Sequence, residues 1–411
     1  MPALQCINLK GNNLECGILK SLGNICNLKE LNLEDNKLNR SLVVVVVKNL
    51  SGCTKDSLEV LHLARNQLTR ALPDLSRLLS LRKFSLSGNQ LEGPLPVSIE
   101  KMSQLVFLDV SSNSLHGVIY EVHLFNLTKL QALSLSFNSL SFNLSSNWIP
   151  PFQLDYIGMR PCSLGPQFPS WLRWQNHCSY LDISHSNISD AIPDWFWNLT
   201  SPKPMYFNLS SNKISGSIPN MPIKFDGMAL IDLSSNLFHG PIPLFLSNSM
   251  ILDLSNNMFI GSLLFLCTST SNNNLYYLDL SNNLLSDEIP NCWNKYEGLI
   301  AIHLENNNLL GVIPNSLGSL KFLKSLRLRN TSLYGEIPHS LKNCTELLLM
   351  DLEENKLTGM IPPWVVIGMR MQVFKLPICK IYFCLYTFPI ECLIPLIQAD
   401  SEGHVTYRIV P

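Results

Sequence analysis

The sequence predicts an α/β-type repeat solenoid: a curved right-handed superhelix with a parallel β-sheet on its concave face and mostly loop with short 3-10 or helical turns on its convex face. Three observations lead to this prediction. One pattern of leucines and asparagines recurs along nearly the whole chain, its period is close to 24 residues, and only 15% of the 411 residues are charged. Because about 25% is typical, we expect asparagine and serine to cover the surface.

The repeated pattern is L-x-x-L-x-L-x-x-N-x-L, which defines a leucine-rich repeat. Clear copies are Leu28–Leu38, Leu105–Leu115, Leu275–Leu285 and Leu347–Leu357. Eight of the fourteen spacings between successive asparagine positions are 24 residues. These positions are Asn12, Asn36, Asn66, Asn89, Asn113, Asn138, Cys162, Ser186, Asn212, Asn236, Asn257, Asn283, Asn307, Thr331 and Asn355.

Each repeat is expected to form one coil of the solenoid. The x-L-x-L-x segment reads as a short strand with leucines inward and variable residues outward, and consecutive strands stack in parallel. The asparagine amide both donates and accepts hydrogen bonds, which suits the buried turn backbone of neighbouring coils. Cys162, Ser186 and Thr331 can replace only part of that bonding.

A second motif, G-x-I-P, follows many of the predicted strands. It occurs at Gly216–Pro219, Gly240–Pro243, Gly311–Pro314, Gly335–Pro338 and Gly359–Pro362. Proline at its end tolerates only extended backbone and removes one hydrogen-bond donor.

With this motif, the 24-residue unit resembles the plant-specific class of extracellular leucine-rich repeats. The segments WIPPFQLDYIGMRPCSLGPQFPSWL (Trp148–Leu172), YLDISHSNISDAIPDWFWNLT (Tyr180–Thr200) and LRNTSLYGEIPHSLKNCTEL (Leu328–Leu347) are similar to plant receptor-like proteins of the type that perceives fungal ethylene-inducing xylanase. The resemblance covers roughly residues 1–365. It implies an extracellular repeat domain at the plasma membrane that signals through partner receptor kinases.

Two segments are expected from the period: a leucine-rich-repeat domain of about 15 repeats with an uncapped N-terminus over residues 1–365, and a degenerate final repeat with an irregular hydrophobic tail over residues 366–411. The final repeat is expected at Met371–Cys379. The valine run Val43–Val47 is interpreted as buried filler on the convex side.

The chain as given shows no sequence signal of its own for export or membrane insertion. Its first twenty residues lack the continuous apolar core of a signal peptide. The candidate membrane segment, Ile381–Ile397, has 17 residues and contains Glu391, Pro389 and Pro395. A spanning helix needs about 20 apolar residues and resists a buried charge, so insertion is the less favoured interpretation.

Composition and motifs argue against several function classes. The net charge of −1 provides no basic field for nucleic acid. The sequence contains no phosphate-binding glycine loop, no G-x-S-x-G elbow and no kinase motifs, so we expect neither an enzyme nor a cofactor. CxxC pairs are absent, which disfavours a structural metal. A column of aspartates, Asp182, Asp232, Asp253 and Asp279, with Asn208 among them, is interpreted as generic sheet surface rather than a cation or acid/base site.

Ligand binding is the better supported function, because a long sheet presents outward side chains in a regular grid. Tyrosine and arginine are enriched at interface hot spots, and the arginine fork suits carboxylate or phosphate-like groups. The candidate ligand-binding residues are Tyr156, Tyr180, Tyr206 and Tyr277, and a charged group formed by His303, Glu305, Arg327 and Arg329.

Two covalent features are expected if the protein is exported. Among the N-x-S/T acceptors, Asn126, Asn198 and Asn343 fall away from the strands and are the favoured glycosylation sites, whereas Asn208 and Asn330 would place sugar on the recognition face. Cys267 and Cys292 lie 25 residues apart, nearly one coil, so stacking can bring them within disulfide reach.

The leading hypothesis is a fragment of a plant cell-surface receptor-like protein that recognises a protein, peptide or glycan ligand in defence, with a receptor kinase as co-receptor by resemblance. Two alternatives stay open: a secreted leucine-rich-repeat inhibitor of a pathogen wall-degrading enzyme, and a non-functional truncated product. A membrane helix downstream in the full transcript would favour the receptor, and a stop after a cysteine cap would favour the inhibitor.

Overall fold

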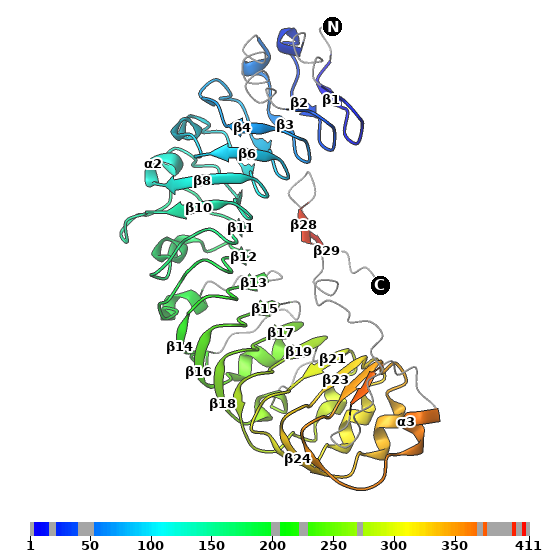
Figure 1. Cartoon of the computed structure of the whole chain (residues 1–411). Helices are drawn as coiled ribbons and strands as arrows, with labels where there is room; N and C mark the ends of the chain where they lie inside the picture. The colour runs from blue at the N-terminus through cyan, green and yellow to red at the C-terminus, as the bar shows by residue number, and fades with distance from the viewer. Residues whose placement is uncertain are drawn as a thin grey trace. The chain divides into compact units, whose positions relative to one another are not determined.

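A computed structural model describes residues 4–15, 22–39, 53–198, 206–221, 229–268 and 274–367, together with the strands at 373–375, 397–399 and 405–407 (Figure 1). Packing divides the chain into two compact units, Met1–Ser201 (unit 1) and Pro202–Pro411 (unit 2). In each unit, successive coils contribute short strands to one long parallel sheet, which we call the primary sheet. This confirms the predicted leucine-rich-repeat solenoid.

The primary sheet follows the order of the chain in both units, as expected when consecutive coils stack. In unit 1 its strands are β1 (Cys6–Asn8), β2 (Glu30–Asn32), β3 (Val60–His62), β5 (Lys83–Ser85), β7 (Phe107–Asp109), β9 (Ala132–Ser134), β11 (Tyr156–Gly158) and β12 (Tyr180–Asp182). In unit 2 they are β13 (Tyr206–Asn208), β15 (Leu230–Asp232), β17 (Ile251–Asp253), β19 (Tyr277–Asp279), β21 (Ala301–His303), β23 (Ser325–Arg327), β25 (Leu349–Asp351) and β27 (Val373–Lys375).

The strand register places equivalent repeat positions side by side. Leu278 of β19 pairs with Ile302 of β21, which pairs with Leu326 of β23. These three side chains are fully buried. The second inward leucine of each motif behaves in the same way, as at Leu280. The core is therefore a continuous stack of aliphatic side chains inside the coils, and the alternate residues face outward.

The asparagine of each repeat joins its own coil to the preceding one, as the motif predicted. Asn307 donates from Nδ2 to the carbonyl oxygens of Leu304 at 3.0 Å and Leu280 at 2.9 Å. Its Oδ1 accepts from the backbone N of Leu285 at 3.0 Å. At one substituted position, Cys162 Sγ lies 3.6 Å from the Leu135 carbonyl oxygen. A thiol cannot reproduce the four-way bonding of an amide.

A second set of parallel strands follows the asparagine turns, and we call these sheets the flank sheets. In unit 1 the strands are β4 (Thr69–Ala71), β6 (Gln90–Gly93), β8 (Ser114–Ile119) and β10 (Ser139–Phe142). In unit 2 they are β14 (Ser215–Ser217), β16 (Leu237–Pro241), β18 (Met258–Gly261) and β20 (Leu284–Leu285), then β22 (Leu310–Gly311), β24 (Ser332–Gly335) and β26 (Lys356–Leu357). Figure 1 shows β14, β16 and β18 running side by side.

At Gly311–Pro314 and Gly335–Pro338, the G-x-I-P motif ends a flank strand and begins a 3-10 helix. Gly311 has φ of 87°, a left-handed conformation that favours glycine. Pro314 then caps the 3-10 helix η10 in extended conformation, with φ of −73° and ψ of 141°. Pro338 does the same for η11. The motif therefore turns the chain from the flank sheet into the convex side of the coil.

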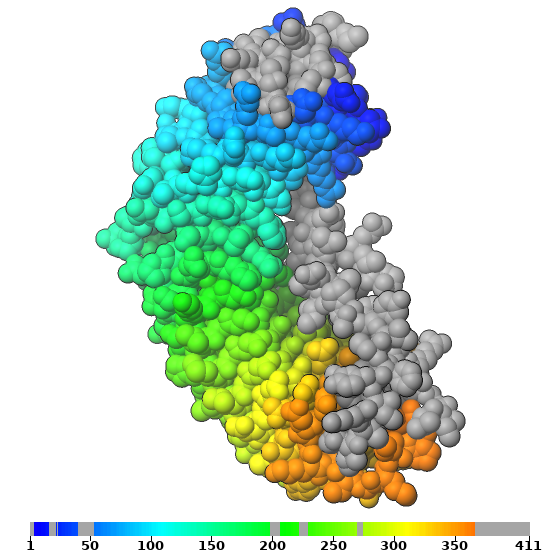
Figure 2. All heavy atoms as spheres, in the orientation of Figure 1, coloured from blue at the N-terminus to red at the C-terminus, as the bar shows by residue number. Residues whose placement is uncertain are grey.

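In the described part of the chain, the convex side consists of 3-10 helices and the short α-helices α2 and α3. They are η2 (Leu22–Asn24), η3 (Cys53–Asp56), η4 (Val97–Lys101), α2 (Glu121–Leu124), η5 (Ser170–Trp174), η6 (Asp194–Asn198), η7 (Leu244–Asn248), η8 (Leu263–Leu266), η9 (Trp293–Lys295), η10 (Asn315–Ser319), η11 (His339–Asn343) and α3 (Pro363–Ile367). Within the described ranges, no helix has the length and hydropathy that a membrane span needs. Successive coils of unit 2 pack directly on one another (Figure 2).

Some sequence expectations fall on residues that the structure leaves undescribed. Val43–Val47 lies outside the described residues, and so does the candidate membrane segment 381–397 apart from its last residue, Ile397. Within the expected final repeat, β27 pairs in parallel with β25, joining Val373 to Leu349. In the tail, β28 (Ile397–Ala399) and β29 (Val405–Tyr407) form an antiparallel pair.

Candidate ligand-binding surface

The primary sheet of unit 2 brings several predicted binding residues into one row. In each repeat one outward residue lies between the two inward leucines of the strand, and it pairs with its counterpart on the next strand. Asp279, His303 and Arg327 are therefore consecutive neighbours on β19, β21 and β23. Adjacent strands lie about 4.8 Å apart. Side chains that are separated by 24 residues in sequence can therefore touch.

His303 is the centre of a hydrogen-bonded group on this face, which we call the histidine cluster: Tyr277, Asp279, His303 and Ser325. His303 Nδ1 lies 3.1 Å from Asp279 Oδ2, and its Nε2 lies 2.9 Å from Ser325 Oγ. The Tyr277 hydroxyl donates to the same Asp279 oxygen at 3.2 Å. Its ring meets the imidazole edge to face, with centroids 5.5 Å apart.

The histidine cluster is buried although its side chains stand on the outward side of the sheet. Tyr277, Asp279 and His303 are only 6%, 6% and 4% exposed. Burial alone would raise the pKa of Asp279, but the hydrogen bond and charge of His303, with two bonds from Ser281, bring it below its usual value. The cluster therefore favours an ionised Asp279 within a fixed arrangement.

The neighbouring aspartate behaves in the opposite way. Burial, followed by the carboxylates of Asp279 and Asp232 on the two adjacent strands, raises the pKa of Asp253 well above its usual value. Asp253 Oδ1 also accepts from the Ser255 backbone N at 3.0 Å. The same turn bond recurs at Asn208, whose Oδ1 accepts from Ser210 N at 3.0 Å. The same side-chain position thus stabilises the turn in both coils, and the ionised form of Asp253 is in addition disfavoured by its two neighbouring carboxylates.

The charged residues of the predicted group lie beside the histidine cluster. Arg327 Nη1 is 3.6 Å from Glu305 Oε1, and Arg329 Nη1 is 3.5 Å from Glu353 Oε2. The Arg327 and Arg329 side chains remain 36% and 40% exposed. Glu305 Oε2 is buried without a hydrogen-bond partner, and burial raises the pKa of this carboxyl group. The two guanidinium groups are therefore positioned by carboxylates while still reachable from solvent.

The predicted tyrosines make several kinds of contact. In unit 1, Tyr156 and Tyr180 stack on adjacent strands with ring centroids 4.2 Å apart and an interplanar angle of 9°. Burial raises the pKa of Tyr156 to about 12. In unit 2, the hydroxyl of Tyr206 accepts from Asn208 Nδ2 at 3.3 Å, and Tyr277 belongs to the histidine cluster. The repeat pattern placed these tyrosines at equivalent positions of their strands, but it did not predict which side chains each one contacts.

The hydrogen-bonded sequence Ser325, His303 and Asp279 has the order of a hydrolase triad. Such a triad needs N–H donors directed at the developing oxyanion. The Ser325 backbone N already donates to the Ile300 carbonyl oxygen at 3.1 Å within the sheet. Among the described residues, no group of three His, Cys, Asp or Glu side chains could hold a metal ion.

A shallow hollow of about 720 Å³ lies elsewhere, in unit 1. Its lining includes Lys29, Glu59 and Arg82. Glu59 pairs with Lys29 at 3.3 Å and with Arg82 at 3.8 Å. None of the predicted binding residues lines this hollow.

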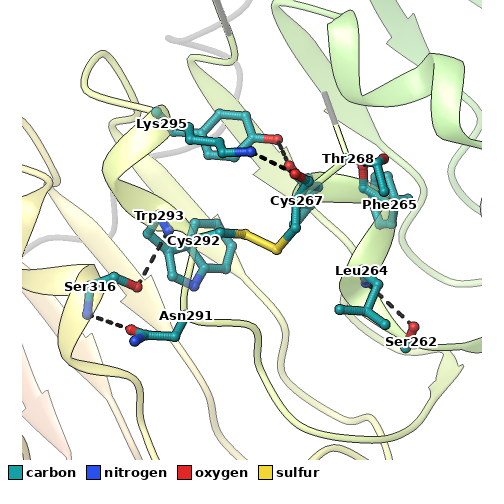
Figure 3. Close-up of a disulfide and its surroundings, with 12 residues drawn as sticks. Ser262, Leu264, Phe265, Cys267, Thr268, Asn291, Cys292, Trp293, Lys295 and Ser316 are labelled. Atoms are coloured by element: carbon teal, nitrogen blue, oxygen red, sulfur yellow. Dashed lines mark hydrogen bonds between the residues drawn. A yellow bond between two sulfur atoms is a disulfide. The ribbon is translucent and has the colours of Figure 1, made fainter. Parts of the chain in front are cut away.

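The pair Cys267 and Cys292 forms a disulfide, with Cα atoms 5.7 Å apart, between the end of η8 and the residue before η9 (Figure 3). Lys295 Nζ donates to the Cys267 carbonyl oxygen at 2.6 Å beside this bridge. A second disulfide joins Cys26 to Cys53, 27 residues apart. The repeat period did not predict the second pair, because these cysteines fall in the irregular early spacing.

The favoured glycosylation sites differ in accessibility. Asn343 is exposed at the end of η11. Asn126 is half-buried and donates to Glu100 Oε2 at 2.9 Å. Asn198 ends η6, and its side chain lies outside the described residues. Asn208, on the primary sheet, is 4% exposed.

Comparison with known proteins places these features in a family. The Leucine Rich Repeat family model matches residues 80–102, 177–199, 274–295, 298–320 and 322–344. Receptor-like protein EIX2 of Solanum lycopersicum is 42% identical over 187 residues, which are 46% of this chain and 18% of that protein. Receptor-like protein EIX1 of the same organism is 48% identical over 134 residues, 33% of this chain and 13% of that protein. The chain contains leucine-rich repeats and is similar to plant receptor-like proteins.

Solved structures of plant receptor ectodomains share the repeat fold of this chain. The ectodomain of the Arabidopsis receptor kinase HAESA, in complex with an extended IDA peptide hormone, is 27% identical to the receptor-like chain with a TM-score of 0.70, covering 91% of this chain and 62% of that one. A TDR receptor gives 26% identity and a TM-score of 0.72, covering 90% and 67%. The receptor-like chain matches less than a fifth of the length of either tomato relative.

Proposed function

We propose that this chain is part of an extracellular recognition domain of a plant cell-surface receptor, and that the outward face of β19, β21 and β23 binds a protein or peptide ligand. The observation that carries the proposal is the histidine cluster. Its side chains are fixed by mutual hydrogen bonds before any ligand arrives. Pre-organised surfaces bind with a smaller entropic cost than mobile ones.

The two arginines supply the chemistry for contact. Arg327 and Arg329 stand beside the rigid cluster with their guanidinium groups partly exposed. A planar guanidinium binds a carboxylate through two parallel hydrogen bonds. We therefore propose that the ligand presents an acidic side chain or a terminal carboxylate to this pair.

The biological setting follows from the relatives and is part of the proposal. The tomato relatives are receptor-like proteins, and the resemblance described above is to receptors that perceive fungal ethylene-inducing xylanase. A related HAESA complex contains both the IDA peptide hormone and the co-receptor SERK1. We propose a role in defence signalling at the outer face of the plasma membrane, with a receptor kinase as signalling partner.

The test measures binding of the secreted full chain to purified fungal ethylene-inducing xylanase and to synthetic peptides tiled across it. The double variant R327E/R329E should weaken binding at least about tenfold, equivalent to ~1.4 kcal/mol. The control is R173E, which makes the same charge change on the 3-10 helix η5. Equal affinity of the wild type, R327E/R329E and R173E would refute binding at the outward face of β19, β21 and β23. Absence of binding to the xylanase and to every peptide would refute the proposed ligand.

A further inference from the structure

Glu305 stands where the three preceding coils have a serine. Ser234, Ser255 and Ser281 each donate from Oγ to the aspartate two residues earlier in their own coil, at 2.7, 2.7 and 2.6 Å. In the coil of β21, His303 replaces that aspartate and Glu305 replaces the serine. The preceding coils show that the repeat does not need a carboxylate at this position, so the contacts of Glu305 must explain what it does.

The two oxygens of the Glu305 carboxyl group have different surroundings. Oε1 lies 3.6 Å from Nη1 of Arg327 on β23. Oε2 is buried without a hydrogen-bond partner. The Glu305 side chain is 15% exposed, whereas that of Arg327 is 36% exposed. The ion pair thus joins a mostly buried acid to a guanidinium group that solvent, or a ligand, can reach.

Charged groups from three neighbouring coils face Glu305. They are His303 on its own coil, Asp279 on β19 and Arg327 on β23. Burial is the largest effect and raises the pKa of Glu305, and the charge of Asp279 acts in the same direction. The charges of His303 and Arg327, with a backbone hydrogen bond, act against it, and the net direction is upward. Arg329, the counterpart of Glu305 on the next coil, pairs with carboxylates of the coil after that. Glu305 therefore gains a proton at a higher pH than an ordinary glutamate does.

A ligand carboxylate that binds Arg327 meets Glu305 as a competitor. While Glu305 is ionised, it occupies the guanidinium group and also repels the incoming carboxylate. If the ligand takes Arg327 away, Glu305 is left as a mostly buried charge without its counter-charge. Such a charge is strongly unfavourable, and a carboxyl group in this position becomes protonated instead. Protonation removes both the competition and the repulsion.

We infer that Glu305 holds Arg327 in the free protein and is displaced from it by the acidic group of the ligand, with uptake of one proton by Glu305. This inference rests on the proposed function, because it needs Arg327 to meet a ligand carboxylate. The sign of the pH dependence follows: affinity rises as pH falls through the titration of Glu305, while the ligand's own carboxylates, with an ordinary pKa of about 4, stay ionised. Glu305 is thus a positioning residue that makes recognition of an acidic ligand sensitive to pH.

The contact between Glu305 and Arg327 is tested without a ligand, from the rate at which p-hydroxyphenylglyoxal modifies each arginine of the secreted full chain at pH 8, measured by peptide mapping. An ionised Glu305 stabilises the protonated guanidinium group, which does not react, so E305Q should raise the Arg327 rate about threefold. Arg329 has its partners on the following coil and should react as before. The control E288Q makes the same change at an exposed residue beyond β20 and should alter neither rate. An equal Arg327 rate in wild type and E305Q would overturn the inference.

A hexa-aspartate peptide tests the coupling to protons, with a hexa-asparagine peptide as the uncharged control. Between pH 8 and pH 5.5 the affinity of the wild type for hexa-aspartate should rise at least about threefold. E305Q should bind more tightly than the wild type at pH 8 and change less with pH, and any change that it retains belongs to His303 or other groups. Identical pH profiles of wild type and E305Q would overturn the inference.

The variant R327E/R329E separates this inference from the proposed function. Its binding of hexa-aspartate should be weaker than that of the wild type at every pH. Binding that R327E/R329E leaves unchanged would overturn the carboxylate contact of the proposed function. Faster modification of Arg327 in E305Q would in that case still support the hold of Glu305 on Arg327, because that measurement involves no ligand.

Discussion

His303 Nδ1 lies 3.1 Å from Asp279 Oδ2, although the two residues are 24 positions apart in the sequence and both project from the outward side of the sheet. The repeat period brings them together, since one coil further along the chain is one strand further along the sheet. This contact gives Asp279 a different electrostatic environment from Asp253 on the neighbouring strand. Replacing each aspartate with asparagine should therefore change the stability of the fold in opposite directions.

Replacing Asp253 with asparagine should stabilise the fold at neutral pH. The folded-state pKa of Asp253 is raised, so its ionised form costs stability that grows as pH rises from the unfolded-state value of about 3.9 toward the folded-state pKa. D253N removes this cost, while an amide retains the turn bonds, as Asn208 shows. We expect a gain of about 1 kcal/mol at pH 7 that disappears below about pH 4, measured by urea denaturation at several pH values.

Replacing Asp279 with asparagine should destabilise the fold at neutral pH. The folded-state pKa of Asp279 is lowered, so its stabilising contribution is present above the unfolded-state pKa and is lost as pH falls through the folded-state pKa. D279N removes the charged partner of His303, and we expect a loss of about 1–3 kcal/mol at pH 7. The same denaturation series measures it. A loss that stayed constant down to pH 2 would contradict the electrostatic explanation.

Asn307 and Asn308 are adjacent in sequence but should respond very differently to alanine. Asn307 is buried and bonds to the coil on which it sits and to the preceding coil, whereas Asn308 is exposed. N307A leaves several buried backbone groups unpaired, so we expect a loss of about 2–4 kcal/mol. N308A serves as the control, with an expected change within about 0.5 kcal/mol. Similar melting temperatures for the two variants would argue against the asparagine ladder.

Gly318 should not tolerate a methyl group. A Cβ at Gly318, on η10, would lie 2.3 Å from the Ser340 carbonyl oxygen on η11. G318A must therefore separate the two 3-10 helices, with an expected cost of about 1–3 kcal/mol. At Gly298 the same Cβ would meet no atom within 4 Å, so G298A is the matched control. Thermal melting of both variants decides between a packing constraint and a general preference for glycine.

The Cys267–Cys292 disulfide should form in secreted protein and contribute to stability. It closes a loop of 25 residues, for which chain entropy predicts about 3.5 kcal/mol. Peptide mapping under non-reducing conditions should recover the linked pair, and the variant C267S/C292S should unfold at lower denaturant concentration. C344A, which removes a buried free thiol, reports the effect of losing a cysteine without losing a bridge. Recovery of both cysteines as free thiols would rule the bridge out.

The architecture was predictable from the sequence because each of its causes is local to one repeat. The alternating leucines define the strand, the asparagine defines the turn, and the proline of G-x-I-P begins the 3-10 helix, as Pro314 shows. The separation of Cys267 and Cys292 by nearly one coil also predicted that the two could form a disulfide. Cys26–Cys53 lies where the spacing is irregular, so its pairing was not evident.

The properties of the candidate site were less predictable, because they depend on contacts between coils. Tyr277 and His303 were recognisable as outward residues, but their burial and shared contact with Asp279 arise from side-chain packing across strands. The raised pKa of Asp253 likewise depends on the acids on both neighbouring strands. Arg327 and Arg329 were found by their departure from the usual polar residues, whereas their carboxylate partners emerged only from the fold.

The asparagine ladder also bears on how such proteins change over evolutionary time. Each amide, as at Asn307, bonds only within its own coil and to the one before it. A gene duplication that adds one whole repeat therefore creates another junction of the same kind and leaves the older junctions intact. Lineages can lengthen or shorten the array in steps of one repeat and acquire new outward side chains with each step, without rebuilding the interior.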